Sequence, residues 1–315
     1  MSLPMPLQPS QYRILNPAQP DVSRARQCAL AVMAKAPRPG KVKTRLSPPL
    51  TLDQTADLNI CFLRDTTHNI SEVCTAAKTP ESEIVILSAA KDLLLASQTT
   101  PPPAAGLISY TPVGDESAFN TLLPPDFALV PQRGDTFGER LLAAAQDILA
   151  LGYGSVCLID SDSPTVPAAA FMLAIQALHA PGDTRNRIVL GPSNDGGYYL
   201  IGLTHPHPEP FTNITWSTAS VFAETTERCW DANLDVLLLP LWYDVDDAAT
   251  LQILTAELLQ STPPPFTTIP GYPAPHTRAY LATLQQGSEA QQGSEAQQGS
   301  EAQQRSEAQQ GSEAK

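Results

Sequence analysis

The stretch CALAVMAKAPRPGKVKTRL, residues 28–46, indicates the class of the fold. Its first seven residues, Cys28 to Ala34, are all apolar, which is typical of a short strand buried in a sheet. Pro37, Pro39 and Gly40 follow directly and end the strand in a constrained loop. The sequence therefore predicts a first strand that runs into a loop rich in proline and positive charge.

Similar apolar runs recur along the chain and alternate with longer helical patterns. We expect strands at Ala29–Met33, Ile84–Leu87, Ala128–Val130, Val156–Ile159, Ile188–Leu190, Tyr198–Leu203 and Leu234–Leu239. Helices are expected at Thr51–Val73, Gly138–Leu149, Ala168–His179 and Thr218–Trp230. This alternation predicts an α/β fold with a mainly parallel sheet flanked by helices. Ligands of such sheets bind beyond the carboxyl ends of the strands, so the loops there should hold the functional residues.

Composition divides the chain into four parts. Residues 1–27 hold several Pro and Gln and predict a loosely ordered lead-in, whereas 28–260 form the predicted α/β domain. Residues 261–284 predict a Pro-rich linker, and 285–315 repeat QQGSEA, which has no large apolar side chain and predicts a disordered tail. Residues 88–126 show no clear pattern, and we interpret them as an insertion near the side of the domain where an acceptor molecule would bind.

The net charge and the cysteines of the chain exclude some classes of protein. A formal net charge of -13 argues against nucleic acid as a partner, because many Lys and Arg side chains bind phosphate backbones. The five cysteines are widely spaced and lack a CxxC pair, so we expect reduced thiols. No apolar run is long enough to span a bilayer and none resembles a signal peptide. We expect a cytoplasmic protein that does not contact the membrane.

The loop after the first strand concentrates positive charge. Residues 35–45 hold five of the 19 Lys and Arg residues of the chain. Phosphates bind where such side chains and flexible backbone N–H groups meet, so this loop predicts a nucleotide phosphate site. A solvated basic patch is the alternative. GxxxxGK[ST] and GxGxxG are both absent. The candidate phosphate-binding residues are Lys35, Gly40, Lys41, Lys43 and Arg45.

Carboxylates follow two later strands. Asp160 and Asp162 form a DxD arrangement after Val156–Ile159, and Asp195 follows Ile188–Leu190. Carboxylate oxygens suit Mg²⁺ or Mn²⁺, which binds through one or two of them together with substrate phosphates. We therefore expect a metal at Asp160, Asp162 and Asp195. The alternative is that these residues serve only in turns or cap helices.

Further candidates surround these carboxylates. Asp195 and Glu139 are candidate general bases, although Glu139 is equally well explained as part of a helix start. Asp244, Asp246 and Asp247 predict either another metal ligand or a cap for a helix over 248–258, and the cap is slightly favoured. The candidate substrate-binding residues are Gly196, Gly197, Tyr198, Trp216, Ser217 and Thr218; for Trp216–Thr218 a buried Trp before a helix cap explains the pattern equally well.

Six ordered blocks together resemble one family. They are AKAPRPGKVKTRL (34–46), GDTFGERL (134–141), LIDSDSP (158–164), LGPSNDGGYYLIGL (190–203), FTNITWST (211–218) and YDVDD (243–247). They resemble the bacterial DUF2064 family, also called the rSAM/selenodomain-associated transferase 1 family, over about residues 28–256. The resemblance implies a GT-A-like nucleotide-diphospho-sugar transferase fold and glycosyltransferase activity. The family more often has Gly at the position of Asp160 and Cys at that of Ser163, which makes Asp162 the better candidate ligand.

The resemblance and the residues together predict an enzyme, a metal-dependent glycosyltransferase with a nucleotide-sugar donor and a small-molecule acceptor. The first block is also similar to 2-phospholactate guanylyltransferases, so nucleotidyl transfer from a nucleoside triphosphate is the alternative. A nucleotide-binding protein without catalysis is the third hypothesis. The sequence assigns no base, sugar, acceptor or oligomeric state.

Overall fold

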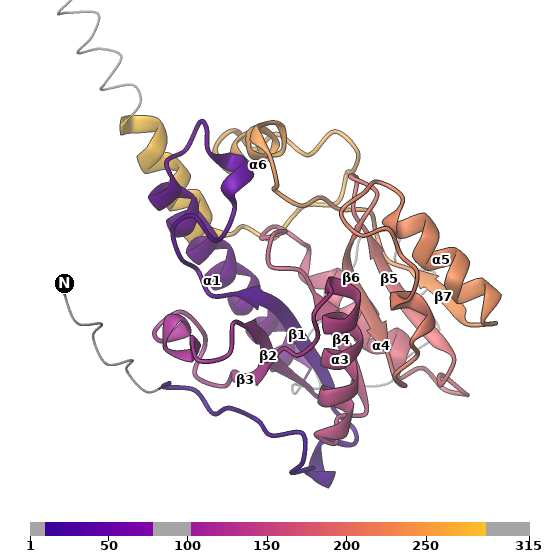
Figure 1. Cartoon of the computed structure of the whole chain (residues 1–315). Helices are drawn as coiled ribbons and strands as arrows, with labels where there is room; N and C mark the ends of the chain where they lie inside the picture. Colours follow the sequence, from indigo (N-terminus) through magenta and orange to yellow (C-terminus); the bar gives the residue numbers. More distant parts are fainter. Residues whose placement is uncertain (1–9, 78–101, 288–315) are drawn as a thin grey trace, which may run out of the picture.

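The computed structural model describes residues 10–77 and 102–287 (Figure 1). Its centre is a seven-stranded sheet of order β3-β2-β1-β4-β6-β5-β7. Only β6 runs antiparallel to its neighbours, β4 and β5. The predicted α/β fold with a mainly parallel sheet is confirmed. The strands are β1 (Cys28–Lys35), β2 (Ala104–Thr111), β3 (Ala128–Pro131), β4 (Ser155–Ile159), β5 (Arg187–Pro192), β6 (Tyr198–Leu203) and β7 (Asp235–Leu238).

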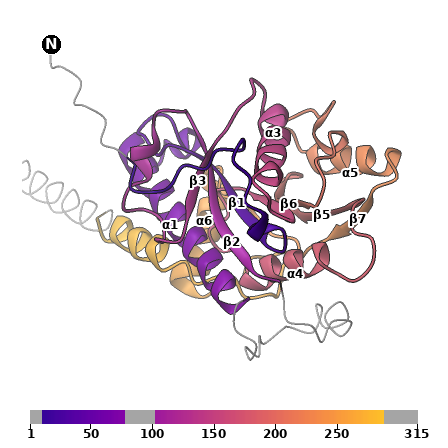
Figure 2. The same cartoon turned by 90° about the horizontal axis from the view of Figure 1, so that it is seen from below.

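Helices cover both faces of the sheet, which gives three layers (Figure 2). Besides a last helix over residues 275–287, the described α-helices are α1 (Leu52–Ala76), α3 (Phe137–Ala150), α4 (Ala168–Leu178), α5 (Val221–Asp231) and α6 (Ala248–Gln260). Side chains of α1, α4 and α6 share one apolar cluster, and those of α3 and α5 share the other. Single 3-10 turns are η1 (Val22–Arg24), η2 (Thr44–Leu46), η4 (Glu116–Phe119) and η5 (Glu209–Phe211).

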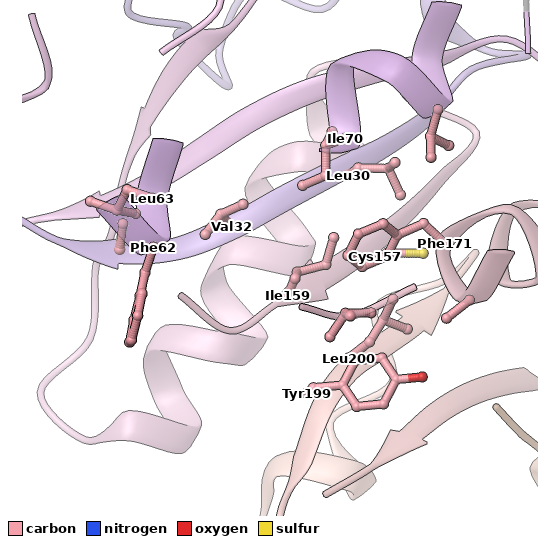
Figure 3. Close-up of a cluster of buried hydrophobic side chains, with 14 of the residues drawn as sticks. Leu30, Val32, Phe62, Leu63, Ile70, Cys157, Ile159, Phe171, Tyr199 and Leu200 are labelled. Carbon is pink, nitrogen blue, oxygen red and sulfur yellow. The ribbon is translucent and has the colours of Figure 1, made fainter. Parts of the chain in front are cut away.

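Alternation along β1 builds the core on both faces. Leu30 and Val32 are fully buried in the cluster that contains Phe62 and Ile70 of α1 (Figure 3). Ala31, which lies between them, belongs to the apolar cluster on the other face of the sheet, because successive side chains of a strand point to opposite faces. A strand buried on both faces explains why the run at 28–34 is continuously apolar.

The interpretation of residues 88–126 as an insertion is wrong for the part that the structure describes. Residues 104–111 form β2, which pairs with β1 along its whole length, from Cys28 opposite Ala104 to Lys35 opposite Thr111. This strand therefore lies inside the sheet. The expected strand at Ile84–Leu87 lies outside the described residues.

The segments around the predicted domain also contact it. Of the lead-in, residues 10–27 are described; Ile14 bridges to Leu129 of β3 and Leu15 is buried. After α6 the chain continues without regular structure and then forms a helix over residues 275–287. Residues 288–315 of the predicted tail lie outside the described part. No helix of the described residues is long and apolar enough to cross a membrane.

The helix at 275–287 begins against α1. Its first N–H groups need acceptors, and Ala274, which precedes it with a φ of 40°, has no side-chain oxygen to offer. Asp65 of α1, which is fully buried, accepts from the N–H groups of His276 at 3.0 Å and Thr277 at 2.7 Å. A residue more than two hundred positions away therefore caps this helix.

Replacing this cap should destabilise the protein. Asp65→Ala leaves a buried and a partly buried N–H group without an acceptor, so we expect the free energy of unfolding to fall by about 2 kcal/mol. Urea unfolding would measure this loss. The exposed Asp126→Ala is the control and should change stability little. Equal stability of the two variants would contradict the capping role of Asp65.

Candidate functional site

The candidate site lies along one edge of the sheet, because β1, β4, β5 and β7 all point the same way. Their carboxyl ends lead into loops that begin at residues 36, 160, 193 and 239. Ligands of open α/β sheets bind at this edge. Two pockets open there, one with four Lys and Arg residues in its lining and one with five aspartates.

The cationic pocket has a volume of about 250 Å³ and gathers four of the five candidate phosphate-binding residues. Lys35, Lys41, Lys43 and Arg45 line it, whereas Gly40 does not. Gly40 has a φ of 71° in a turn closed by a 3.0 Å hydrogen bond from the N–H of Lys41 to the carbonyl of Arg38. Its role is therefore to let the loop turn.

Lys43 differs from the other cations because its ammonium is buried. Only 4% of its side chain is exposed, and Nζ lies 2.9 Å from Asp162 Oδ2, 2.9 Å from Asp246 Oδ1 and 2.8 Å from the carbonyl oxygen of Val245. Burial lowers the pKa of Lys43, but the charges of the two aspartates outweigh it and raise that pKa overall. Lys43 thus ties the first loop to the carboxylate loops, with its donors already engaged.

Asn59 of α1 also lines the cationic pocket and was not predicted from the sequence. Its side chain is almost fully buried, and its Oδ1 has no hydrogen-bond partner among the described residues. A buried amide oxygen without a partner costs free energy unless a ligand supplies a donor. Asn59 gave no signal in the sequence, because this residue lies in the middle of a helix rather than in a loop.

The acidic pocket has a volume of about 500 Å³ and brings together aspartates from three loops. Its acidic lining is Asp160, Asp162, Asp195, Asp244 and Asp246. The predicted Asp160, Asp162 and Asp195 therefore line one pocket, together with Asp244 and Asp246, for which the sequence predicted either a metal ligand or a helix cap. Arg45, Asp162 and Asp246 line both pockets, so the two share one boundary.

Burial and neighbouring charges raise the pKa values of two of these carboxylates, Asp160 and Asp244. Burial, followed by the charge of Asp162, raises the pKa of Asp160 well above its ordinary value, against the hydrogen bond from Ser163 Oγ at 2.7 Å. Burial, followed by the charges of Asp195 and Asp246, raises the pKa of Asp244 to about 6. The pocket therefore carries more negative charge than its own cations offset.

This donor set fits a hard divalent cation in its chemistry. Carboxylate oxygens are the ligands that Mg²⁺ and Mn²⁺ prefer, and a cation would relieve the excess charge of the pocket. Across residues 10–77 and 102–287, however, no three His, Cys, Asp or Glu side chains converge on one point. Asp160, Asp162 and Asp195 are thus not a preformed three-ligand site, and phosphate oxygens would have to complete the coordination.

Two candidate acids serve as helix caps. Glu139 accepts from the N–H groups of Asp135 at 2.8 Å and Thr136 at 3.1 Å in a capping box at the start of α3. It does not line the acidic pocket, so its position does not support a role as general base. Asp247 caps α6 in the same way with Thr250, which leaves Asp244 and Asp246 to the pocket.

Aromatic side chains also line the acidic pocket. Trp216 meets Phe137 edge to face at 5.1 Å and Tyr198 at 6.4 Å between ring centres. Of the predicted substrate-binding residues, Gly197, Tyr198, Trp216, Ser217 and Thr218 line the pocket. Gly196 does not; its φ is 91°, and an added Cβ would lie 2.1 Å from the carbonyl oxygen of Ala219. Gly196 therefore shapes the loop instead.

The buried ion pair predicts a measurable coupling. Lys43→Met removes the ammonium between Asp162 and Asp246, whose side chains are 33% and 43% exposed. Because water still reaches both carboxylates, we expect the free energy of unfolding to fall by about 2 kcal/mol, less than for a fully buried pair. Urea unfolding measures it, with the exposed Lys41→Met as the control.

The double variant Lys43→Met/Asp246→Asn should lose less free energy of unfolding than the two single variants together. The reason is that Asp246→Asn removes one of the two carboxylate charges that repel each other once the ammonium is gone. Additive losses would show that Lys43 and Asp246 do not interact.

Comparisons with known proteins agree with this architecture. A model of the family described as uncharacterized protein conserved in bacteria (DUF2064) matches residues 94–218. No curated protein matches the chain. A solved structure from Desulfovibrio desulfuricans G20, described as a "putative nucleotide-diphospho-sugar transferase", is 28% identical, with a TM-score of 0.60 over 81% of this chain and 97% of that one.

Two more distant structures are also matched. One is a CMP:2-keto-3-deoxy-manno-octonic acid synthetase complexed with CTP, 9% identical over 75% of this chain and 100% of that one, with a TM-score of 0.42. The other is a 4-diphosphocytidyl-2C-methyl-D-erythritol synthase, 9% identical over 73% and 96%, with a TM-score of 0.37. The resemblance to the DUF2064 family and the nucleotide-diphospho-sugar transferase type of fold, both expected from the sequence, are confirmed.

Proposed function

We propose that this chain is a nucleotide-dependent transferase that transfers a glycosyl group from a nucleotide sugar to a small acceptor. The observation that carries the proposal is the shared boundary of the two pockets. Arg45, Asp162 and Asp246 line both, so a diphosphate in the cationic pocket would adjoin a transferred group in the acidic pocket. The similarity to the Desulfovibrio structure supports the transferase class.

The cations that remain free favour a diphosphate over a triphosphate. Lys43 is engaged by Asp162 and Asp246, and Arg38 is paired with Asp115. Within the described residues, Lys35 and Lys41 are exposed and have no ion pair, and Arg45 has only a 3.7 Å contact with Asp246 while 72% of its side chain is exposed. Fewer available cations suit the smaller anion, so we rank glycosyl transfer above nucleotidyl transfer.

The residues of the chain divide the chemistry between the pockets. In the transfer, a bond forms between the acceptor oxygen and the anomeric carbon, while the bond from that carbon to the diphosphate oxygen breaks and its electron pair leaves with the diphosphate. Lys35, Lys41 and Arg45 stabilise the charge that develops on this leaving group. Asp195, which is exposed at the acidic pocket, receives the proton of the acceptor hydroxyl.

We further propose that Asp162, with Asp160 beside it, holds Mg²⁺ or Mn²⁺. Such an ion would neutralise the charge of the bound diphosphate. Asp162 is the better ligand because it lines both pockets, whereas Asp160 accepts a hydrogen bond from Ser163 and has a raised pKa.

Thermal unfolding with a panel of ligands tests the proposed class. We expect a nucleotide sugar or nucleoside diphosphate to stabilise the protein more with Mg²⁺ or Mn²⁺ than without. A ligand at a hundredfold excess over its Kd adds about 2.7 kcal/mol to the free energy of unfolding. Asp162→Asn should remove the dependence on metal. Stabilisation by no nucleotide would overturn the proposal.

Product analysis then separates the two reactions. Release of a nucleoside diphosphate from the nucleotide sugar would support glycosyl transfer. Release of pyrophosphate from a triphosphate, with no turnover of any nucleotide sugar, would establish nucleotidyl transfer instead. Binding without turnover of either would favour a protein without catalysis.

The cationic pocket predicts a charge-specific loss of affinity. Lys41→Ala removes an exposed cation that faces the pocket, so we expect nucleotide affinity to fall about tenfold, or ~1.4 kcal/mol. Isothermal titration measures the change. Arg278→Ala removes an exposed cation outside this pocket and should leave the affinity unchanged. Equal losses in both variants would mean that net charge, rather than this pocket, governs binding.

A further inference from the structure

We infer that the acidic pocket selects a hydroxylated acceptor with an apolar face, and excludes acceptors that carry a phosphate group. This inference rests on the proposed transferase function and names its acceptor class. Three observations carry it, namely the charge of the pocket, its aromatic lining and its separation from Lys35 and Lys41.

The charge of the lining disfavours an anion. Five aspartates line the pocket, and Arg45 is the one cation among its described lining residues. Lys43 of the adjoining pocket pairs with two of these aspartates, Asp162 and Asp246, so the aspartates still outnumber the two cations that contact them. A phosphate group placed there would meet like charges at short range, which costs free energy, whereas hydroxyl groups can donate hydrogen bonds to the carboxylates.

The aromatic part of the pocket lining offers an apolar surface to a ligand. Phe137, whose side chain reaches solvent with 45% of the residue exposed, stacks edge to face on Trp216, and Leu141 and Val221 line the same pocket. Exposed aromatic surface in a pocket gains free energy when an apolar ligand face covers it. A ring that is apolar on one face and hydroxylated at its edge matches both parts of the lining.

Close contact with one glycine fixes the position of Trp216 in this aromatic lining. Gly138 stands in the first turn of α3, and an added Cβ would lie 2.7 Å from Nε1 of Trp216 and 2.6 Å from the carbonyl oxygen of Phe211. The indole therefore rests against bare backbone. Because close contact fixes its position, Trp216 is preorganised to meet a ligand.

The third observation is the division of charge between the two pockets. Lys35 and Lys41 line the cationic pocket and not the acidic one. A phosphate group of either substrate would consequently bind on the cationic side, where the donor diphosphate is proposed to lie. The acidic pocket is left for the group that carries no phosphate.

Tryptophan fluorescence tests the inference without knowledge of the natural substrate. Trp216 lines the pocket, Trp242 is buried, and Trp230 on α5 is 66% exposed and does not line it. The protein would be titrated with phenyl β-D-glucoside and phenyl phosphate, which share a phenyl ring and differ in charge. We expect the glucoside to change the emission with an affinity at least tenfold higher than that of phenyl phosphate.

Matched variants assign the response to the pocket. Trp216→Phe should abolish the fluorescence change, and the control Trp230→Phe should retain it. Gly138→Ala should weaken glucoside binding although it removes no lining side chain, with circular dichroism confirming that the variant is folded.

Three results would overturn the inference: tighter binding of phenyl phosphate through Trp216, a glucoside response that survives in Trp216→Phe, or no response to the glucoside. Nucleotide binding is measured separately at the cationic pocket. If nucleotides bind and the glucoside does not, only the acceptor class is wrong; if nucleotides fail to bind, the transferase function itself falls.

Discussion

The site depends on one buried ammonium group. Lys43 Nζ lies between Asp162 and Asp246 and also donates to the carbonyl oxygen of Val245. These oxygens come from the loop after β4 and the loop before α6, so a single side chain holds three loops at fixed spacing. Its backbone adopts the left-handed region, with a φ of 49°, which a non-glycine residue tolerates only where surrounding contacts stabilise it. The ion pair provides those contacts.

Much of the fold could be predicted because the sheet is buried on both faces. Runs such as Val156–Ile159 and Ile188–Leu190 are continuously apolar, and Pro, Gly or Asp residues end them clearly. Strand β2 escaped prediction for a physical reason. It carries Gly106, Ser109 and Thr111, so its sequence lacks the continuous apolar pattern, yet its pairing with β1 places Leu107, Ile108 and Tyr110 in the core. Tertiary contacts, not local pattern, make it a strand.

The candidate site was predictable where residues follow strands. Lys41, Arg45, Asp162 and Asp195 stand in such loops, and the structure brings them to one edge of the sheet. Local sequence could not separate capping from pocket roles among neighbouring acids. Asp247 satisfies the N–H groups at the start of α6, while Asp246, one residue earlier, turns to Lys43. Asn59 carried no signal, because only the packing of α1 against the loop exposes it to the pocket.

The contact between Gly138 and Trp216 also constrains how this sequence can change over time. A side chain at position 138 would meet the carbonyl oxygen of Phe211 as well as the indole, so a smaller residue at 216 does not by itself make room for one. The constraint therefore acts in one direction. Position 216 can change while the glycine stays, whereas Gly138 can be replaced only if the segment that carries Phe211 also moves.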